Sequence, residues 1–197
     1  MPPENAPVAL IVIDVQQGFN DPWWGPTTNQ PGCEHNIARL LRHWRLTSPG
    51  PVIIVGHDSV NPASPLHPAK PGNHLMEFLG VRDEELFIQK TVNSAFYGRP
   101  DLHDWLKERG IERLVVCGIQ TNMCVETTAR MGGNLGYGVT LVLDATRTFD
   151  LKSDVPGSGV VTLSADDLMR ATAVNLQAGG FAQVTDTDSL LEALAGS

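Results

Sequence analysis

The stretch from Leu114 to Val125 constrains the fold more than any other part of the sequence. It opens with an apolar, β-branched run typical of a buried strand, and Gly118 then breaks that run into a short polar turn. A helical pattern follows over residues 126–131. The stretch therefore predicts a strand that passes into a helix, with Cys124 in the first turn of that helix.

A cysteine in that position has two interpretations. Unpaired N–H groups and the positive end of a helix dipole favour a thiolate, and the same N–H groups can hold an oxyanion. Cys124 is therefore a candidate nucleophile. The alternative is a small buried residue packed between sheet and helix, which is common for a free cysteine.

Further apolar runs predict five more buried strands, and helical spacing separates most of them. The strands are expected at Val8–Asp14, Pro51–Gly56, Leu86–Gln89, Val139–Asp144 and Phe181–Val184, and the helices at Asn36–Leu46, Asp101–Arg109, Ser164–Gln177 and Ser189–Leu194. A loop containing Pro156, Gly157 and Gly159 is expected before Ser164. Alternating strands and helices with buried strands predict a three-layer α/β/α sandwich, formed as a single domain over residues 1–197.

Composition excludes several classes of protein. The formal net charge is −8 and no basic run occurs, which argues against nucleic acid as a partner. No apolar stretch approaches the length of a membrane span, so no membrane partner is expected. Residues 1–5 lack a signal-peptide pattern. The three cysteines have neither disulfide nor zinc-site spacing, which predicts reduced thiols and a cytoplasmic location.

Three strand ends carry chemically useful side chains: Asp14, Lys90 and Cys124. The carboxyl ends of parallel strands share one edge of a sheet, so these groups can converge. In an acyl transfer, Cys124 would be the nucleophile, Asp14 the general base and acid, and Lys90 the cation that keeps Asp14 ionised. Taken singly, Asp14 could be a loop-capping acid and Lys90 a solvated surface lysine.

The same residues resemble the isochorismatase-like cysteine hydrolases. The motifs that carry the resemblance are Leu10–Asp14, Lys90–Phe96, Gly118–Val125, Thr127–Arg130 and Asp144–Thr146. The resemblance spans nearly the whole chain. It implies a Rossmann-like six-stranded parallel sheet in the order 3-2-1-4-5-6, an Asp–Lys–Cys triad, and a homo-oligomer such as a dimer or tetramer. It also implies a non-proline cis peptide between Ile119 and Gln120, and an oxyanion hole formed by the N–H groups of Gln120 and Cys124.

Family members hydrolyse C–N bonds of small carboxamides or carbamoyl compounds, such as nicotinamide, N-carbamoylsarcosine and ureidoacrylate. The resemblance therefore implies a small-molecule substrate, a Cys-acyl intermediate and no cofactor. Isochorismatases proper cleave a vinyl ether and lack the nucleophilic cysteine, so the presence of Cys124 favours amide chemistry. The vinyl-ether reaction is kept as an alternative.

Substrate contacts are less well defined by the sequence. Seven side chains are candidate pocket walls, although each could equally serve packing: Phe19, Trp24, His57, Asn93, Phe96, Tyr97 and Phe149. Nicotinamidases place an Asp–x–His metal motif after the second strand. Here the order is His57-Asp58-Ser59, with His67 and His74 downstream. We therefore expect no metal, and expect His57 and Asp58 to shape the pocket mouth or brace the long loop over residues 57–73.

Three other classes of protein are alternatives to a hydrolase. A nucleotide-binding Rossmann module needs a glycine-rich turn after the first strand, but residues 14–17 read Asp-Val-Gln-Gln. A redox thiol protein needs a resolving cysteine, and only Cys33 could approach Cys124 in space. A degenerate, inactive scaffold is disfavoured by the intact triad.

Overall fold

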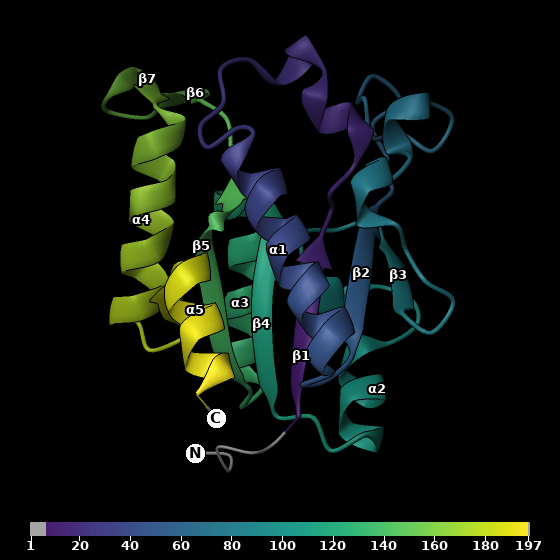
Figure 1. The fold of residues 1–197 in the computed structure, drawn as a ribbon. Helices are drawn as coiled ribbons and strands as arrows, with labels where there is room; N and C mark the ends of the chain where they lie inside the picture. Colours follow the sequence, from purple (N-terminus) through teal and green to yellow (C-terminus); the bar gives the residue numbers. More distant parts are fainter. Residues whose placement is uncertain (1–6, 197) are drawn as a thin grey trace.

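The computed structural model describes residues 7–196, and its main feature is a six-stranded parallel sheet in the order β3-β2-β1-β4-β5-β8 (Figure 1). The strands are β1 (Val8–Ile13), β2 (Val52–His57), β3 (Leu86–Lys90), β4 (Arg113–Ile119), β5 (Gly138–Arg147) and β8 (Gln183–Thr185). Every residue of β1 is buried, because the central strands of a parallel sheet are covered on both faces. The predicted order is confirmed, with β8 as the sixth parallel strand. Residues 1–5, in which no signal-peptide pattern was found, lie outside the described residues.

Helices cover both faces of this sheet, as the alternating pattern predicts. Helices α1 (Gly32–Thr47) and α5 (Thr187–Ala195) pack on one face, whereas α2 (Leu102–Glu108), α3 (Glu126–Asn134) and α4 (Ala165–Ala178) pack on the other (Figure 1). Helix α1 begins before the predicted Asn36, so Cys33 lies inside it. None of the helices within residues 7–196 combines the length and the apolar character that a membrane crossing requires.

The segment between β5 and α4 differs from the prediction. Instead of a loop, it forms an antiparallel hairpin of β6 (Leu151–Val155) and β7 (Gly159–Leu163), seen beside the top of α4 in Figure 1. Gly157 and Gly159 adopt φ values of 81° and 69°, and this left-handed backbone permits the tight reversal between the strands. Most hairpin residues are exposed, so no buried apolar pattern marked the two strands in the sequence.

A bulge divides β5 into two parts. While β4 advances from Val116 to Gly118, β5 advances from Leu141 to Thr146. The bulge frees the carbonyl of Asp144 from the sheet ladder, and that oxygen accepts hydrogen bonds from Asn29 Nδ2 at 2.8 Å and Asn36 Nδ2 at 3.0 Å. Beyond the bulge, the chain is free to run along the carboxyl edge of the sheet.

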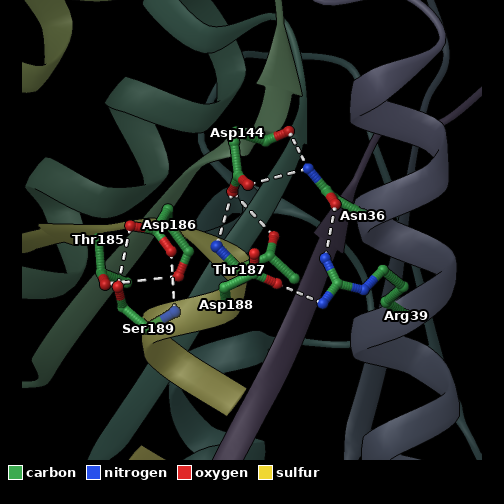
Figure 2. A network of polar contacts seen from close by, with 8 residues as sticks. All are labelled: Asn36, Arg39, Asp144, Thr185, Asp186, Thr187, Asp188 and Ser189. Carbon is green, nitrogen blue, oxygen red and sulfur yellow. Dashed lines mark hydrogen bonds and ion pairs between the residues drawn. The ribbon is translucent and has the colours of Figure 1, made fainter. Parts of the chain in front are cut away.

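The Asp144 side chain joins three elements (Figure 2). Its Oδ1 accepts hydrogen bonds from both N and Oγ1 of Thr187, each at 2.8 Å, and its Oδ2 accepts one from Asn36 Nδ2 at 2.9 Å. Thr187 is the first residue of α5, Asn36 lies in α1, and Asp144 lies in the β5 bulge. The carboxylate thus ties the last helix to the sheet and also lies near the positive end of that helix dipole.

Candidate active site

The carboxyl edge of the sheet brings together the three strand-end residues. Lys90 Nζ lies 2.6 Å from Asp14 Oδ2, and neither side chain is exposed to solvent. A carboxylate oxygen of Asp14, a ring nitrogen of His57 and the sulfur of Cys124 lie within 4.8 Å of one another. The groups therefore converge as the parallel topology requires, although Asp14 and Cys124 are 110 positions apart in the sequence.

Asp14 occupies an unusual backbone position. Its φ is 52°, a left-handed conformation that costs a non-glycine residue on the order of 1 kcal/mol. Its N–H continues the sheet ladder by donating to Val55 O at 2.8 Å, and its carbonyl accepts from Gln16 N at 2.9 Å. Among the described residues, Oδ1 of Asp14 has no hydrogen-bond partner, although it is buried. One carboxylate oxygen thus binds Lys90 and the other is available to a proton donor.

His57 lies beside Lys90 because the two residues are register partners at the ends of β2 and β3. His57 Nδ1 lies 3.2 Å from Lys90 Nζ. Burial, followed by the positive charge of Lys90, lowers the pKa of His57, so the ring is neutral at pH 7 and can accept a hydrogen bond from the ammonium. The Gln16 side chain fixes the His57 backbone, accepting from its N at 2.9 Å and donating to its O at 3.1 Å.

Cys124 lies in a π-helical turn, Thr121–Val125, that follows a cis peptide between Ile119 and Gln120. Two hydrogen bonds anchor this turn to residues that follow the β5 bulge in the chain. Thr121 Oγ1 donates to Thr146 Oγ1 at 2.8 Å, and Thr148 Oγ1 donates to Asn122 Oδ1 at 2.5 Å. Helix α3 begins only at Glu126, so Cys124 precedes the helix and does not lie in its first turn.

The resting state of the thiol also differs from the sequence-based prediction. Burial and the nearby negative charge of Asp14 raise the pKa of Cys124 well above its ordinary value, and Lys90 offsets this only in part. The direction of this shift runs against the stabilised thiolate that the sequence predicts. At neutral pH the sulfur carries its proton and needs a base.

A cavity of about 260 Å³ opens beside these groups. Its lining residues come from the strand ends, the π-helical turn, the loop after β1, the long loop after β2 and the β6 hairpin: Asp14, Phe19, Trp24, His57, Leu66, Asn93, Gln120, Met123, Cys124, Phe149 and Leu151. The thiol of Cys124 donates to Asn93 Oδ1, which lies 3.9 Å from Sγ. Gln120 and Cys124, whose N–H groups are the expected oxyanion hole, both line the cavity.

Phe96 and Tyr97 do not line this cavity, and their assignment as pocket walls is wrong. A short 3-10 turn over Ala95–Tyr97, capped by Ser94, places Phe96 in the core on the α2 and α3 face of the sheet, where it stacks on Tyr137. Tyr97 is 68% exposed.

Three residues that line the cavity were not predicted from the sequence: Leu66, Met123 and Leu151. Met123, next to the candidate nucleophile, was the only one of the three with a signal in the sequence. The other two lie in segments whose paths local patterns do not define.

The histidines downstream of β2 do not form a cluster of metal ligands with His57. Among residues 7–196, the group of ligand-type side chains that gathers closely is Asp14, His57 and Cys124, and the Lys90 ammonium already occupies the neighbourhood of that group. Asp58 braces the long loop: its Oδ1 accepts from Asn73 Nδ2 at 3.0 Å and its Oδ2 from Gln89 Nε2 at 3.2 Å.

Comparisons with known proteins agree with this arrangement. A family model described as Isochorismatase domain matches residues 8–189. The uncharacterized isochorismatase family protein YrdC of Bacillus subtilis is 42% identical over 144 residues, which cover 73% of this chain and 75% of that protein. Nicotinamidase 3 of Arabidopsis thaliana is 28% identical over 208 residues, which cover 99% of this chain and 92% of that protein.

Solved structures give the same result. The structure of a Chromobacterium violaceum protein assigned to the isochorismatase family of hydrolases superposes with a TM-score of 0.87 at 36% identity, covering 100% of both chains. The family model and the structural neighbour both extend over Asp14, Lys90 and Cys124. The chain belongs to the isochorismatase family and is a hydrolase.

Proposed function

We propose that this chain is a cysteine amidohydrolase that cleaves the C–N bond of a small carboxamide, ureide or carbamoyl compound. The observation that carries the proposal is the buried contact of 2.6 Å between Lys90 and Asp14, with the free carboxylate oxygen of Asp14 and the Cys124 thiol at the same cavity. The similarity to Nicotinamidase 3, whose name denotes an amidase, supports C–N chemistry over vinyl-ether cleavage.

The first half of the reaction starts from a protonated thiol, because the pKa of Cys124 is raised. Asp14 accepts the proton of Cys124 as the sulfur attacks the substrate carbonyl, forming the C–S bond and shifting an electron pair onto oxygen. The N–H groups of Gln120 and Cys124 hold this oxyanion. When the intermediate collapses, the C–N bond breaks and Asp14 returns its proton to the leaving amine.

The second half regenerates the enzyme. Water attacks the thioester and gives its proton to Asp14, the C–S bond breaks, and the sulfur recovers that proton as the carboxylic acid leaves. The side chain of Lys90 balances the negative charge that alternates between Asp14 and the oxyanion. His57, as a neutral acceptor at 3.2 Å, keeps the ammonium oriented.

The positions of the other cysteines support hydrolysis over a redox role. Cys33 and Cys117 belong to the core on the α1 face of the sheet, whereas Cys124 belongs to the core on the opposite face. All three thiols are free, and Cys124 belongs to a different core cluster from either cysteine that could form a disulfide with it.

The test is ammonia release from a panel of small amides, ureides and carbamoyl acids, with mass spectrometry of the protein during turnover. We expect ammonia release together with a transient acyl adduct on the protein. In Cys124→Ala, the rate of ammonia release should fall by at least about a thousandfold and the adduct should be lost, while the circular dichroism spectrum stays unchanged. Cys124→Ser serves as the near-isosteric control. Absence of turnover together with a Cys124 that resists iodoacetamide at every pH would overturn the proposal.

A further inference from the structure

We propose that the acyl part of the substrate is an uncharged aromatic or apolar group, recognised by a wall of three aromatic rings, and that substrates with a carboxylate are rejected. We call this set, Phe19, Trp24 and Phe149, the aromatic wall. The inference rests on the proposed function for the amide end of the substrate. It narrows that function, because ureido acids and carbamoyl amino acids carry a carboxylate and simple carboxamides do not.

The aromatic wall is one continuous apolar surface. The ring centroids lie 4.9 Å apart for Phe19 and Trp24, 5.5 Å for Trp24 and Phe149, and 6.0 Å for Phe19 and Phe149. The single polar atom of the wall, Trp24 Nε1, donates to Gly18 O at 2.8 Å. The wall therefore offers ring carbons to the cavity, and these favour a flat apolar group through burial and offset stacking.

The cavity lacks a counter-ion for an anionic substrate. No lysine or arginine is among its lining residues in the described part of the chain. Lys90, behind Asp14, is already paired with it. A carboxylate that entered would lose its hydration without gaining a cation, and burial of an unpaired charge is strongly unfavourable.

Arg147 lies close to the wall, with its guanidinium carbon 5.5 Å from the centroid of the Phe149 ring, but its nitrogens are engaged with other groups. Its side chain is fully buried, with Nε 2.9 Å from Glu34 Oε1. Its other nitrogens donate to Phe19 O at 3.3 Å and Asn20 Oδ1 at 2.9 Å. Arg147 thus holds the backbone that carries Phe19 in place and presents no free charge to the substrate.

The polar lining residues other than Asp14 are uncharged. Asn93 and Gln120 contribute neutral amides, and His57 is uncharged because burial and the charge of Lys90 lower its pKa. These groups suit the carbonyl and NH₂ of a neutral carboxamide. A volume of 260 Å³ lies just below the usual range of about 300–1,000 Å³ for ligand sites, which fits a small substrate such as a single ring with its amide.

The experiment measures binding without turnover, by isothermal titration of Cys124→Ala at pH 7.5. The probes are benzamide, its para-carboxylate terephthalamic acid, and N-carbamoylglycine. We expect benzamide to bind at least roughly a hundredfold more tightly than either anion. In the same background, Trp24→Ala weakens benzamide by about tenfold or more. Tyr97→Ala, which removes an exposed ring outside the cavity, changes the affinity by less than about twofold.

The outcomes separate this inference from the proposed function. Tighter binding of either anion, equal losses in Trp24→Ala and Tyr97→Ala, or no binding of any probe overturns the inference. Because the ligand series needs no change in the wall, it decides the question even where Trp24→Ala does not fold. Tight benzamide binding without hydrolysis by the unmodified protein would contradict the amidase mechanism alone. Thioester-forming hydrolysis of the anions would contradict the substrate class alone.

Discussion

At the scale of single residues, Asp14 has two opposing effects on Cys124. Its negative charge raises the pKa of the thiol, which suppresses the resting thiolate, yet in the proposed mechanism its free oxygen is the base that removes the proton during attack. In the proposed mechanism, Asp14 therefore opposes ionisation of the resting Cys124 thiol and promotes it only in the transition state, where it lowers the barrier to reaction.

The first prediction separates these two effects. Asp14→Asn removes the charge and leaves Lys90 nearby, so the pKa of Cys124 falls and iodoacetamide alkylates it faster at pH 7–8 than in the unmodified protein. Amide hydrolysis falls by about a hundredfold or more, because the general base is lost. Parallel alkylation and ammonia assays measure the two changes. A decrease in both rates would contradict the assignment of Asp14.

The second prediction concerns how the buried ion pair of Asp14 and Lys90 affects the free energy of unfolding. Lys90→Met leaves Asp14 as a buried charge without its partner, and we expect the free energy of unfolding at pH 7 to drop by about 3–5 kcal/mol. The double variant Asp14→Asn/Lys90→Met removes both charges and recovers much of that loss. Urea denaturation of the two single variants and the double variant gives the coupling, and strictly additive losses would mean that the ion pair is energetically unimportant.

At the scale of elements, Asp144 determines how α5 attaches to the sheet (Figure 2). Asp144→Ala removes the acceptor of Thr187 N and Oγ1 and of Asn36 Nδ2, and hydrogen bonds to a charged group contribute about 1.5–3 kcal/mol each. We expect a loss of at least 2 kcal/mol, on the order of one such bond, and faster amide hydrogen exchange in α5.

A matched control lies in the same network. Arg39 and Asp188 form an ion pair whose side chains are 38% and 73% exposed, so Arg39→Ala should cost less than about 1 kcal/mol. Equal losses for Asp144→Ala and Arg39→Ala would show that α5 is held by general surface charge instead of by the Asp144 carboxylate.

The elements also show where prediction from sequence succeeds. The sheet order and the convergence of Asp14, Lys90 and Cys124 follow from local apolar patterns, the rules of parallel topology and the family resemblance. The direction of Phe96 depends on a distant partner, since Ala95 N donates to Thr128 Oγ1 of α3 at 3.0 Å. Leu66 and Leu151 reach the cavity through a long loop and an exposed hairpin, and no periodicity defines such paths.

At the scale of the whole molecule, the neutral state of His57 makes stability depend on pH. Its pKa is lowered from 6.5 in the folded chain, so below pH 6.5 the unfolded chain binds a proton that the folded chain does not. Above pH 6.5, His57 is neutral in both states and does not reduce the free energy of unfolding. As the pH falls toward the pKa of His57 in the folded chain, proton binding by the unfolded chain lowers the free energy of unfolding.

The last prediction follows from that sign. His57→Asn keeps a side-chain acceptor for Lys90 but does not titrate, so its free energy of unfolding falls less steeply between pH 7 and pH 5 than that of the unmodified protein. Chemical denaturation at half-unit pH steps measures both slopes. Identical slopes would indicate that His57 is not held neutral by folding.

The two parts of the cavity have different origins in the chain. The reacting groups stand at the ends of sheet strands or in the turn that follows one, whereas the aromatic wall stands on the segment after β1 and the segment after the β5 bulge. Insertions and substitutions in those connecting segments can change the preferred substrate without moving a strand. A lineage built on this scaffold can therefore acquire new substrates by drift in its connections, while purifying selection on the strand ends preserves the chemistry.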